Sequence, residues 1–176
     1  MSFKKIGLKE PILKALQQKG YKEPTPIQKM AIASIIKNKD VMAAAQTGTG
    51  KTACFTLPIL EILSNKQGNT NRHELNALII TPTRELASQV HDNIKSYGKY
   101  LSLKSIAIYG GVSDLNQKLA IKKGVDIMVA TPGRLLDLYH QKAINFSKIK
   151  ILVLDEADQM LDMGFINDIK KIDKYL

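Results

Sequence analysis

The sequence predicts an α/β fold in which a parallel sheet carries helices on both of its faces. Short runs that are apolar on both faces and bounded by Gly, Pro or Asp are typical of buried parallel strands. Such runs occur at residues 41–45, 77–81, 105–109, 127–131 and 151–154. Longer segments with apolar residues at positions i, i+3 and i+4 alternate with them. This alternation is the pattern of βαβ units.

The segments around these strands predict helices and one exposed loop. In chain order, the predicted helices cover residues 8–19, 27–37, 51–64, 84–100, 116–123 and 135–141. The polar stretch 64–74, which contains Asn and Gly, indicates a loop. Helical spacing of apolar residues continues from Phe165 to Leu176. Ligands bind at the carboxyl ends of the strands in such sheets, so residues that directly follow a strand are the candidates for function.

Length and composition match an ordinary globular protein. The 176 residues, 44% hydrophobic and 24% charged, exclude collagen-like, disordered and disulfide-rich classes. No apolar run approaches the roughly 18 residues of a membrane span, and the first 20 residues lack the apolar core of a signal peptide. We therefore expect one cytoplasmic domain over residues 1–176, without a membrane partner. The single Cys54, which can form no internal disulfide, fits that compartment.

The basic charge has two interpretations. A net charge of +10 arises from 23 lysines and three arginines against 16 acidic residues. It suits either a solvated surface or a polyanion-binding protein, and charge alone leaves both open. His73, His91 and His140 show no metal-ligand spacing, so we expect them at the surface. Cys54 is expected to be a small packed residue.

A glycine-rich segment follows the strand predicted at 41–45 and leads into a helix: Gln46-Thr47-Gly48-Thr49-Gly50-Lys51-Thr52. In such a segment backbone N–H groups converge on phosphate oxygens, the lysine reaches the β- and γ-phosphates, and the last hydroxyl binds Mg²⁺. The segment therefore predicts a nucleotide-binding P-loop, although Ala45 stands where the usual pattern begins with glycine. The alternative is a glycine-rich turn without a ligand.

An acidic tetrapeptide, Asp155-Glu156-Ala157-Asp158, follows the strand predicted at 151–154. Alone, it suits the start of a helix, where acidic side chains complement the helix dipole. Together with a P-loop it favours catalysis, because Asp155 can hold Mg²⁺ and Glu156 can orient and deprotonate the attacking water.

The order of the motifs resembles the first RecA-like domain of a DEAD-box ATP-dependent RNA helicase, over the whole chain. The Q motif spans about residues 3–28, with Phe3 and residues 20–28, and motif I is Ala45 through Thr52. Motif Ia is Pro82-Thr83-Arg84-Glu85-Leu86-Ala87, and the GG element is Gly110-Gly111. Motif Ib is Thr131-Pro132-Gly133-Arg134, and motif II is the acidic tetrapeptide. Each short element is weak alone, and their common order carries the resemblance. It implies a RecA-like P-loop NTPase fold with ATP and Mg²⁺ as cofactors.

The resemblance implies an adenine site at the Q motif. Gln28 presents a donor and an acceptor that can pair with adenine and exclude guanine, while Tyr21 can stack on the base, with Phe3 against the same region. From residue types alone, core packing is the preferred alternative for Tyr21 and Phe3, and a polar helix start for Gln28. Motif I completes the implied ATP site, with catalytic roles for Lys51, Asp155 and Glu156 and metal-binding roles for Thr52 and Asp155.

The resemblance also implies an RNA-binding face. A protein that grips any sequence contacts the sugar–phosphate backbone through arginines, hydroxyls and backbone amides. Two of the three arginines lie in these motifs. The implied RNA-binding set is Pro82, Thr83, Arg84, Gly110, Gly111, Thr131, Pro132, Gly133 and Arg134. Plain turn chemistry is the alternative for the glycines and for residues 131–134.

The implied function is the separation of short RNA duplexes coupled to ATP hydrolysis. The chain ends at Leu176, before the family's Ser-Ala-Thr motif and its second RecA-like domain, so we expect a monomeric fragment with little or no turnover of its own. Two alternatives stay open. One is a non-catalytic module that binds nucleotide or RNA, and the other is a P-loop ATPase that acts on DNA.

Overall fold

The computed structural model describes residues 2–46, 48–66 and 73–176. The described residues pack as two compact units. The amino-terminal unit falls within residues 1–70 and 92–103, and the sheet unit within residues 71–91 and 104–176. Helix α4 (Arg84–Tyr97) contributes residues to both, so the boundary falls inside a helix.

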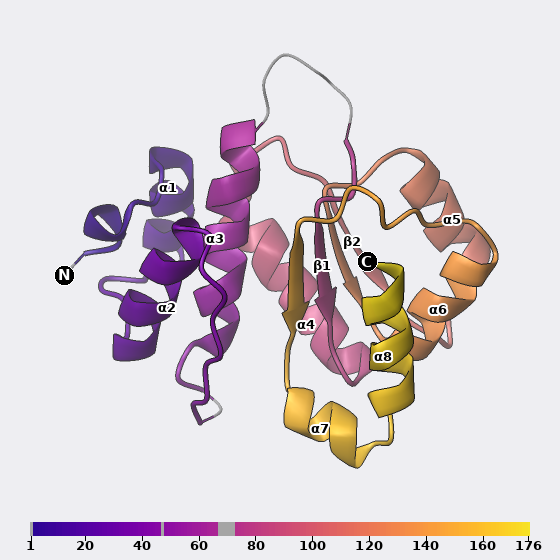
Figure 1. The fold of residues 1–176 in the computed structure, drawn as a ribbon. Coiled ribbons are helices and arrows are strands. Elements are labelled where there is room, and N and C mark those ends of the chain that lie inside the picture. Colours follow the sequence, from indigo (N-terminus) through magenta and orange to yellow (C-terminus); the bar gives the residue numbers. More distant parts are fainter. Residues whose placement is uncertain (1, 47, 67–72) are drawn as a thin grey trace. The chain divides into compact units, whose positions relative to one another are not determined.

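The amino-terminal unit is helical. A short 3-10 helix η1 (Phe3–Ile6) precedes α1 (Glu10–Gln18), α2 (Pro26–Ile36) and α3 (Lys51–Lys66) (Figure 1). Both α1 and α2 carry proline in the first turn, where the N–H that proline lacks would have no partner within the helix. The apolar sides of the three helices are buried, including Ile12, Leu16, Ile32, Leu57 and Leu60. At the start of α1, the backbone N–H of Lys9 donates to the Glu61 carboxylate of α3 at 2.7 Å.

The sheet unit is built on a parallel sheet. Among the described residues, the strands β1 (Ala77–Ile80), β2 (Ser105–Ile108), β3 (Ile127–Ala130) and β4 (Ile151–Leu154) lie in the order β2-β3-β1-β4. Ala77 is in register with Ile127 on one side and Ile151 on the other. Every side chain of β1 and β3 is buried, as the apolar runs predict for central strands.

Helices α6 (Pro132–His140) and α8 (Ile166–Tyr175) lie side by side next to the sheet, while α5 (Asp114–Lys122) follows β2 and α7 (Ala157–Asp162) follows β4 (Figure 1). The core between sheet and helices includes Leu78 and Met128 from the strands and Leu135 and Ile172 from the helices. Ile79, on the opposite face of the sheet, is also fully buried. The α/β fold with a sheet buried on both faces is therefore confirmed.

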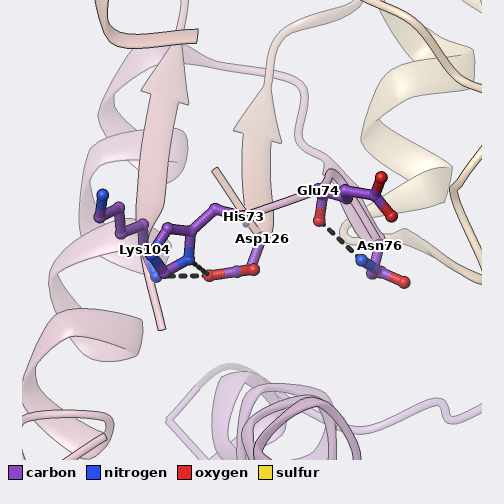
Figure 2. Close-up of polar contacts among 5 residues, drawn as sticks. All are labelled: His73, Glu74, Asn76, Lys104 and Asp126. Atoms are coloured by element: carbon purple, nitrogen blue, oxygen red, sulfur yellow. Dashed lines mark hydrogen bonds and ion pairs between the residues drawn. The ribbon is translucent and has the colours of Figure 1, made fainter. Parts of the chain in front are cut away.

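Asp126 ties together the amino ends of three strands. Its carboxylate oxygen Oδ2 accepts a hydrogen bond from the backbone N–H of Lys104 at 2.8 Å and lies 2.7 Å from Nδ1 of His73 (Figure 2). Its backbone carbonyl accepts from the N–H groups of Asn76 at 3.0 Å and Ala77 at 3.1 Å. The expectation that His73 lies at the surface is wrong: its side chain is 15% exposed and supplies the partner that a buried carboxylate needs.

The strand predicted at 41–45 is wrong. The described residues there form no strand, and the side chains of Val41 and Met42 are 40% and 101% exposed. An apolar run becomes a strand only where a neighbour accepts its hydrogen bonds, and none of the described strands pairs with it.

The other strands and the helices are confirmed, with ends that differ by a few residues. The loop predicted at 64–74 begins later than expected, since α3 continues to Lys66. Residues 67–72 of that prediction lie outside the described residues.

Candidate functional site

The predicted P-loop lies in the amino-terminal unit, directly before α3. Gly48 and Gly50 have φ angles of +84° and +86°, which glycine adopts without a steric penalty. The Thr49 hydroxyl donates to the carbonyl of Gln46 at 2.7 Å, so the loop turns back on itself. Ahead of a helix of 16 residues, such a loop presents backbone N–H groups and the positive end of the helix dipole to an anion. Thr47 lies outside the described residues.

Two Q-motif side chains hold the P-loop. The Thr25 hydroxyl donates to the carbonyl of Thr49 at 3.2 Å, and Nε2 of Gln28 donates to the carbonyl of Gly50 at 3.2 Å. Gln28 is 1% exposed. A Cβ at Gly50 would collide with the Gln28 amide nitrogen. Glycine is therefore needed at this position both for its backbone angle and for the space.

The same two Q-motif residues start helix α2. The backbone N–H of Gln28 donates to the Thr25 hydroxyl at 3.4 Å, and the backbone N–H of Thr25 donates to Oε1 of Gln28 at 3.0 Å. This is a capping box. The contact between Gln28 and the P-loop was not predicted from the sequence, although the Thr-x-x-Gln spacing of the capping box indicates that the Gln28 side chain turns back toward Thr25.

Phe3 and Tyr21 lie in an aromatic cluster with Tyr97. Tyr21 meets Phe3 and Tyr97 edge to face, with ring centroids 6.2 Å and 5.9 Å apart, and the two tyrosine hydroxyls are 2.9 Å apart. Burial raises the pKa of Tyr97, and the hydrogen bond to Tyr21 raises it further. Phe3 is 4% exposed, which matches the packing interpretation, whereas Tyr21 is only half-buried.

The acidic motif lies at the carboxyl end of β4 in the sheet unit. The backbone N–H of Asp155 donates to the carbonyl of Ile80 at 2.9 Å, and the Asp155 residue is 8% exposed. Glu156 has φ +54° and ψ +50°, a left-handed conformation that costs roughly 1–2 kcal/mol for a residue with a side chain. Strained backbone of this kind gathers at functional sites.

Three predicted RNA-binding residues meet at the carboxyl ends of the strands. Nη1 of Arg84 lies 3.3 Å from the position of a Cβ on Gly111, which has φ +79°. Nη2 of Arg134 donates to the carbonyl of Val112 at 3.4 Å. The loop after β2 therefore lies between an arginine at the start of α4 and an arginine in the first turn of α6.

The other residues of motifs Ia and Ib shape the helix starts. The Thr83 hydroxyl accepts from the backbone N–H of Leu86 at 3.2 Å and so caps α4. Pro132 is buried in the first turn of α6, while Gly133 is exposed. Thr131 makes no side-chain cap for α6.

Acidic side chains accompany these arginines. Glu85 accepts from Nη2 of Arg84 at 3.1 Å, with side chains 67% and 56% exposed respectively. Lys118, 2.8 Å from Asp114, holds the pKa of that carboxyl below its usual range, and the charge of Arg134 adds a smaller contribution. Exposed pairs of this kind are weak and are screened by salt, so an anion such as a phosphate can replace the Glu85 carboxylate at Arg84.

The remaining chemistry of the described residues is sparse. Burial raises the pKa of the Cys54 thiol to about 11, so this group is a poor nucleophile. Within the described ranges, no three His, Cys, Asp or Glu side chains gather as metal ligands. The groups predicted to hold Mg²⁺, Thr52 and Asp155, lie in different units. Among the described residues, no helix is long and apolar enough to cross a membrane.

Comparison with known proteins supplies the deciding observation. The sequence matches the family model described as "DEAD/DEAH box helicase" over residues 25–176, which is well over half of the chain. The chain belongs to the DEAD/DEAH box helicase family. The resemblance carried by the motif order is thereby confirmed.

Curated relatives of this DEAD/DEAH box chain are much longer than it is. The DEAD-box ATP-dependent RNA helicase RhpA of Helicobacter pylori (strain B128) is 49% identical over 175 residues, which make up 99% of this chain and 34% of that protein. The ATP-dependent RNA helicase CshA of Limosilactobacillus reuteri is 44% identical over 174 residues, which are 99% of this chain and 34% of that protein. The chain therefore spans about a third of the length of these relatives.

A solved structure confirms the RecA-like fold of the DEAD/DEAH box chain. The crystal structure of a hypothetical ATP-dependent RNA helicase from Sulfolobus tokodaii matches it with a TM-score of 0.86 and 40% identity, over 96% of this chain and 47% of that one. The contacts described above bring together two groups of predicted site residues. The P-loop lies with the Q motif in the amino-terminal unit, and the arginines lie with the GG loop in the sheet unit. Their roles toward ATP and RNA stay predictions.

Proposed function

We propose that this region binds ATP and RNA as the first RecA-like domain of an ATP-dependent RNA helicase, and that its two units together form the ATP-binding domain over residues 1–176. The observation that carries the proposal is the pair of hydrogen bonds from Thr25 and Gln28 to the P-loop. It joins a phosphate-binding loop to side chains of the type that recognises a base. The printed names of the relatives, which are ATP-dependent RNA helicases, support the same function.

Each motif has a separate part in the proposed hydrolysis. Lys51 would neutralise the β- and γ-phosphates, and Thr52 and Asp155 would hold Mg²⁺, which prefers oxygen ligands of these kinds. When bound, the ion would supply charge stabilisation for the phosphoryl group. Glu156, whose backbone is already turned into the left-handed region, orients and deprotonates the attacking water.

The Gln28 amide already has partners within the chain. Its Oε1 accepts from Thr25 and its Nε2 donates to Gly50, which leaves one N–H and one lone pair of the amide for a base. Adenine can therefore pair with this amide while both bonds to the chain remain. We infer that base binding and P-loop geometry are coupled through Gln28, while Tyr21 packs against the base and Phe3 supports Tyr21.

RNA contact is proposed for the loop and helix starts at the carboxyl ends of the strands. Arg84, Gly111 and Arg134 present guanidinium groups and exposed backbone in one place, which suits phosphates and requires no readout of bases. In the longer relatives, a second RecA-like domain would complete this face and the ATP site. This chain alone is proposed to be monomeric and to hydrolyse ATP weakly or not at all.

Binding titrations with the chain test the proposal. A fluorescent ATP analogue with Mg²⁺ should bind, and Lys51→Ala should weaken binding at least about tenfold, because a charge-assisted contact is lost. Single-stranded RNA should bind better than DNA of the same sequence, and Arg84→Ala should weaken RNA binding but not nucleotide binding. Lys99→Ala, on an exposed lysine outside the motifs, is the matched control.

Three results would count against the proposal. Failure to bind the ATP analogue would refute the nucleotide site. Equal affinity for DNA and RNA would favour the alternative of a P-loop ATPase that acts on DNA. Strong stimulation of ATP hydrolysis by RNA would contradict the expectation that the chain alone is nearly inactive.

A further inference from the structure

Helix α5 turns a glutamine toward the interior and its leucines toward solvent. Of the nine described residues of this helix, Gln117 alone is buried, at 6% exposed. Leu115 and Leu119 are 61% and 50% exposed. Burial of an amide in preference to a leucine opposes the hydrophobic effect. The placement of Gln117 therefore needs a reason other than core packing.

Gln117 holds the start of the loop that carries the GG element. Its Nε2 donates to the carbonyl of Tyr109 at 3.0 Å, directly after β2. Three residues further along, Nη2 of Arg134 donates to the carbonyl of Val112 at 3.4 Å. The two glycines thus lie between two carbonyls, each fixed by a side chain from a different helix. Glycine has more backbone freedom than any other residue. The two bonds therefore limit the conformations that Gly110 and Gly111 can adopt.

The arrangement leaves polar atoms without partners. Among the described residues, Oε1 of Gln117 and Nη1 of Arg134 are buried and have no hydrogen-bond partner. Unpaired buried groups are rare in proteins because each one destabilises the fold. An apolar side chain of similar size at position 117 would avoid one of them but would lose the bond to the Tyr109 carbonyl. The sequence therefore retains at this position an amide that is only partly satisfied, as positions that serve function often do.

We propose that Gln117 is a positioning residue that sets the Gly110-Gly111 backbone for contact with an RNA phosphate. The proposal rests on the proposed RNA-binding function of this face. Gln117 acts through the carbonyl of Tyr109, to which its Nε2 donates. The Arg84 guanidinium, which lies against Gly111, gains a fixed neighbour, so that arginine and loop backbone can receive the same phosphate without prior ordering.

Gln117→Met tests this role because methionine keeps the volume and removes both amide atoms. We expect the dissociation constant for a fluorescent single-stranded RNA to rise about three- to tenfold, the range that corresponds to one hydrogen bond. The melting temperature should change little, since removal of the unpaired Oε1 offsets the loss of the bond to the Tyr109 carbonyl. Affinity for an ATP analogue should be unchanged. Asn116→Ala, on an exposed neighbour in the same helix, should change none of the three.

Amide spectra give a second readout that a merely structural role would not produce. In Gln117→Met the NMR signals of Gly110 and Gly111 should shift and their amide hydrogen exchange should accelerate, while signals from β1 and β3 stay in place. If Gln117→Met does not fold, Gln117→Asn provides the test, because its shorter amide is withdrawn from the Tyr109 carbonyl and should weaken RNA binding to a similar extent.

The outcomes separate this inference from the function on which it rests. Wild-type chain that binds RNA, with Gln117→Met binding equally well, overturns the positioning role and leaves the RNA face intact. A variant that melts earlier and loses RNA and nucleotide binding together shows a purely structural role and also overturns it. Wild-type chain that does not bind RNA refutes the proposed RNA face and the positioning role with it.

Discussion

Replacement of Gln28 by leucine removes the link between the Q motif and the P-loop with little change in side-chain volume. The Gln28 amide accepts from the backbone N–H of Thr25 and donates to the carbonyl of Gly50. Leucine leaves the Thr25 N–H without its acceptor, whereas the Gly50 carbonyl keeps a bond from the N–H of Ala53 at 3.2 Å. The expected loss is therefore dominated by one orphaned donor, whose bond to Gln28 is also half of the capping box.

The size of this loss follows from these contacts. The lost half of the capping box is the same bond as the one that orphans the Thr25 N–H, so it is counted once, at about 1–3 kcal/mol. The added apolar burial of leucine offsets part of this loss. We therefore expect Gln28→Leu to lower the free energy of unfolding by about 1–2 kcal/mol. Urea denaturation followed by circular dichroism measures it, and Gln17→Leu, on an exposed glutamine of α1, should stay within about 0.5 kcal/mol of wild type.

Measurements of nucleotide binding separate the two roles of Gln28, which are the capping of α2 and the recognition of adenine. If its amide recognises adenine, Gln28→Leu should weaken binding of an ATP analogue more than binding of tripolyphosphate, measured under conditions in which both variants are folded. Unfolding of Gln28→Leu at the same urea concentration as Gln17→Leu would refute the energetic reasoning. Loss of stability with unchanged discrimination between adenine and guanine nucleotides would refute base recognition and leave the capping box standing.

Three further predictions concern stability. Asp126→Ala should lower the free energy of unfolding by about 2–4 kcal/mol, because the Lys104 N–H and His73 lose a buried charged partner; equal stability of Asp126→Ala and the exposed-site control Asp173→Ala would contradict this. Glu156→Gly should leave stability unchanged or raise it by up to about 1 kcal/mol, since φ is +54°, whereas Glu85→Gly in the helical region of α4 should lower it by about 1 kcal/mol; losses of equal size in both variants would show that Glu156 is not strained. Burial raises the Cys54 pKa from 9.0 to about 11, so the thiol of the unfolded chain ionises at lower pH than the thiol of the folded chain. The free energy of unfolding should therefore fall between pH 9 and 11 in the wild type, and fall less in Cys54→Ala. Parallel pH profiles of the two proteins would refute this.

The sequence was sufficient to predict the sheet wherever strands are apolar on both faces. Every side chain of β1 and β3 is apolar and buried, so these two runs suit only the interior of a sheet. The run at 41–45 has a similar composition, and yet Met42 is fully exposed. Composition indicates that a segment can form a strand, but hydrogen bonds to a neighbour decide whether it does, and a neighbour is a property of the tertiary fold.

The site was predictable in its motifs and not in their mutual contacts. The order of motifs located the P-loop, the acidic motif and the arginines, although only the acidic motif and the arginines follow strands in the structure. Neither the bond from Gln28 to Gly50 nor the pairing of His73 with Asp126, 53 residues apart, has a local signal. Gln117 was missed for the same reason, since its role depends on which side of α5 meets the loop after β2.

The two ends of the sheet differ in how completely their polar groups are satisfied. At the amino end, the Asp126 carboxylate and carbonyl together receive the N–H groups that precede β1 and β2 and the ring of His73. At the carboxyl end, Glu156 is held in a left-handed conformation, and Gln117 and Arg134 each keep a buried atom without a partner among the described residues. Glycine at position 156 would relieve the first feature, and an apolar side chain at position 117 would remove one of the unpaired atoms. Their presence at the end where ligands of parallel sheets bind is what a trade of stability for function predicts, and it gives Glu156→Gly and Gln117→Met the same expected signature: a fold of nearly unchanged stability and a function that is weakened.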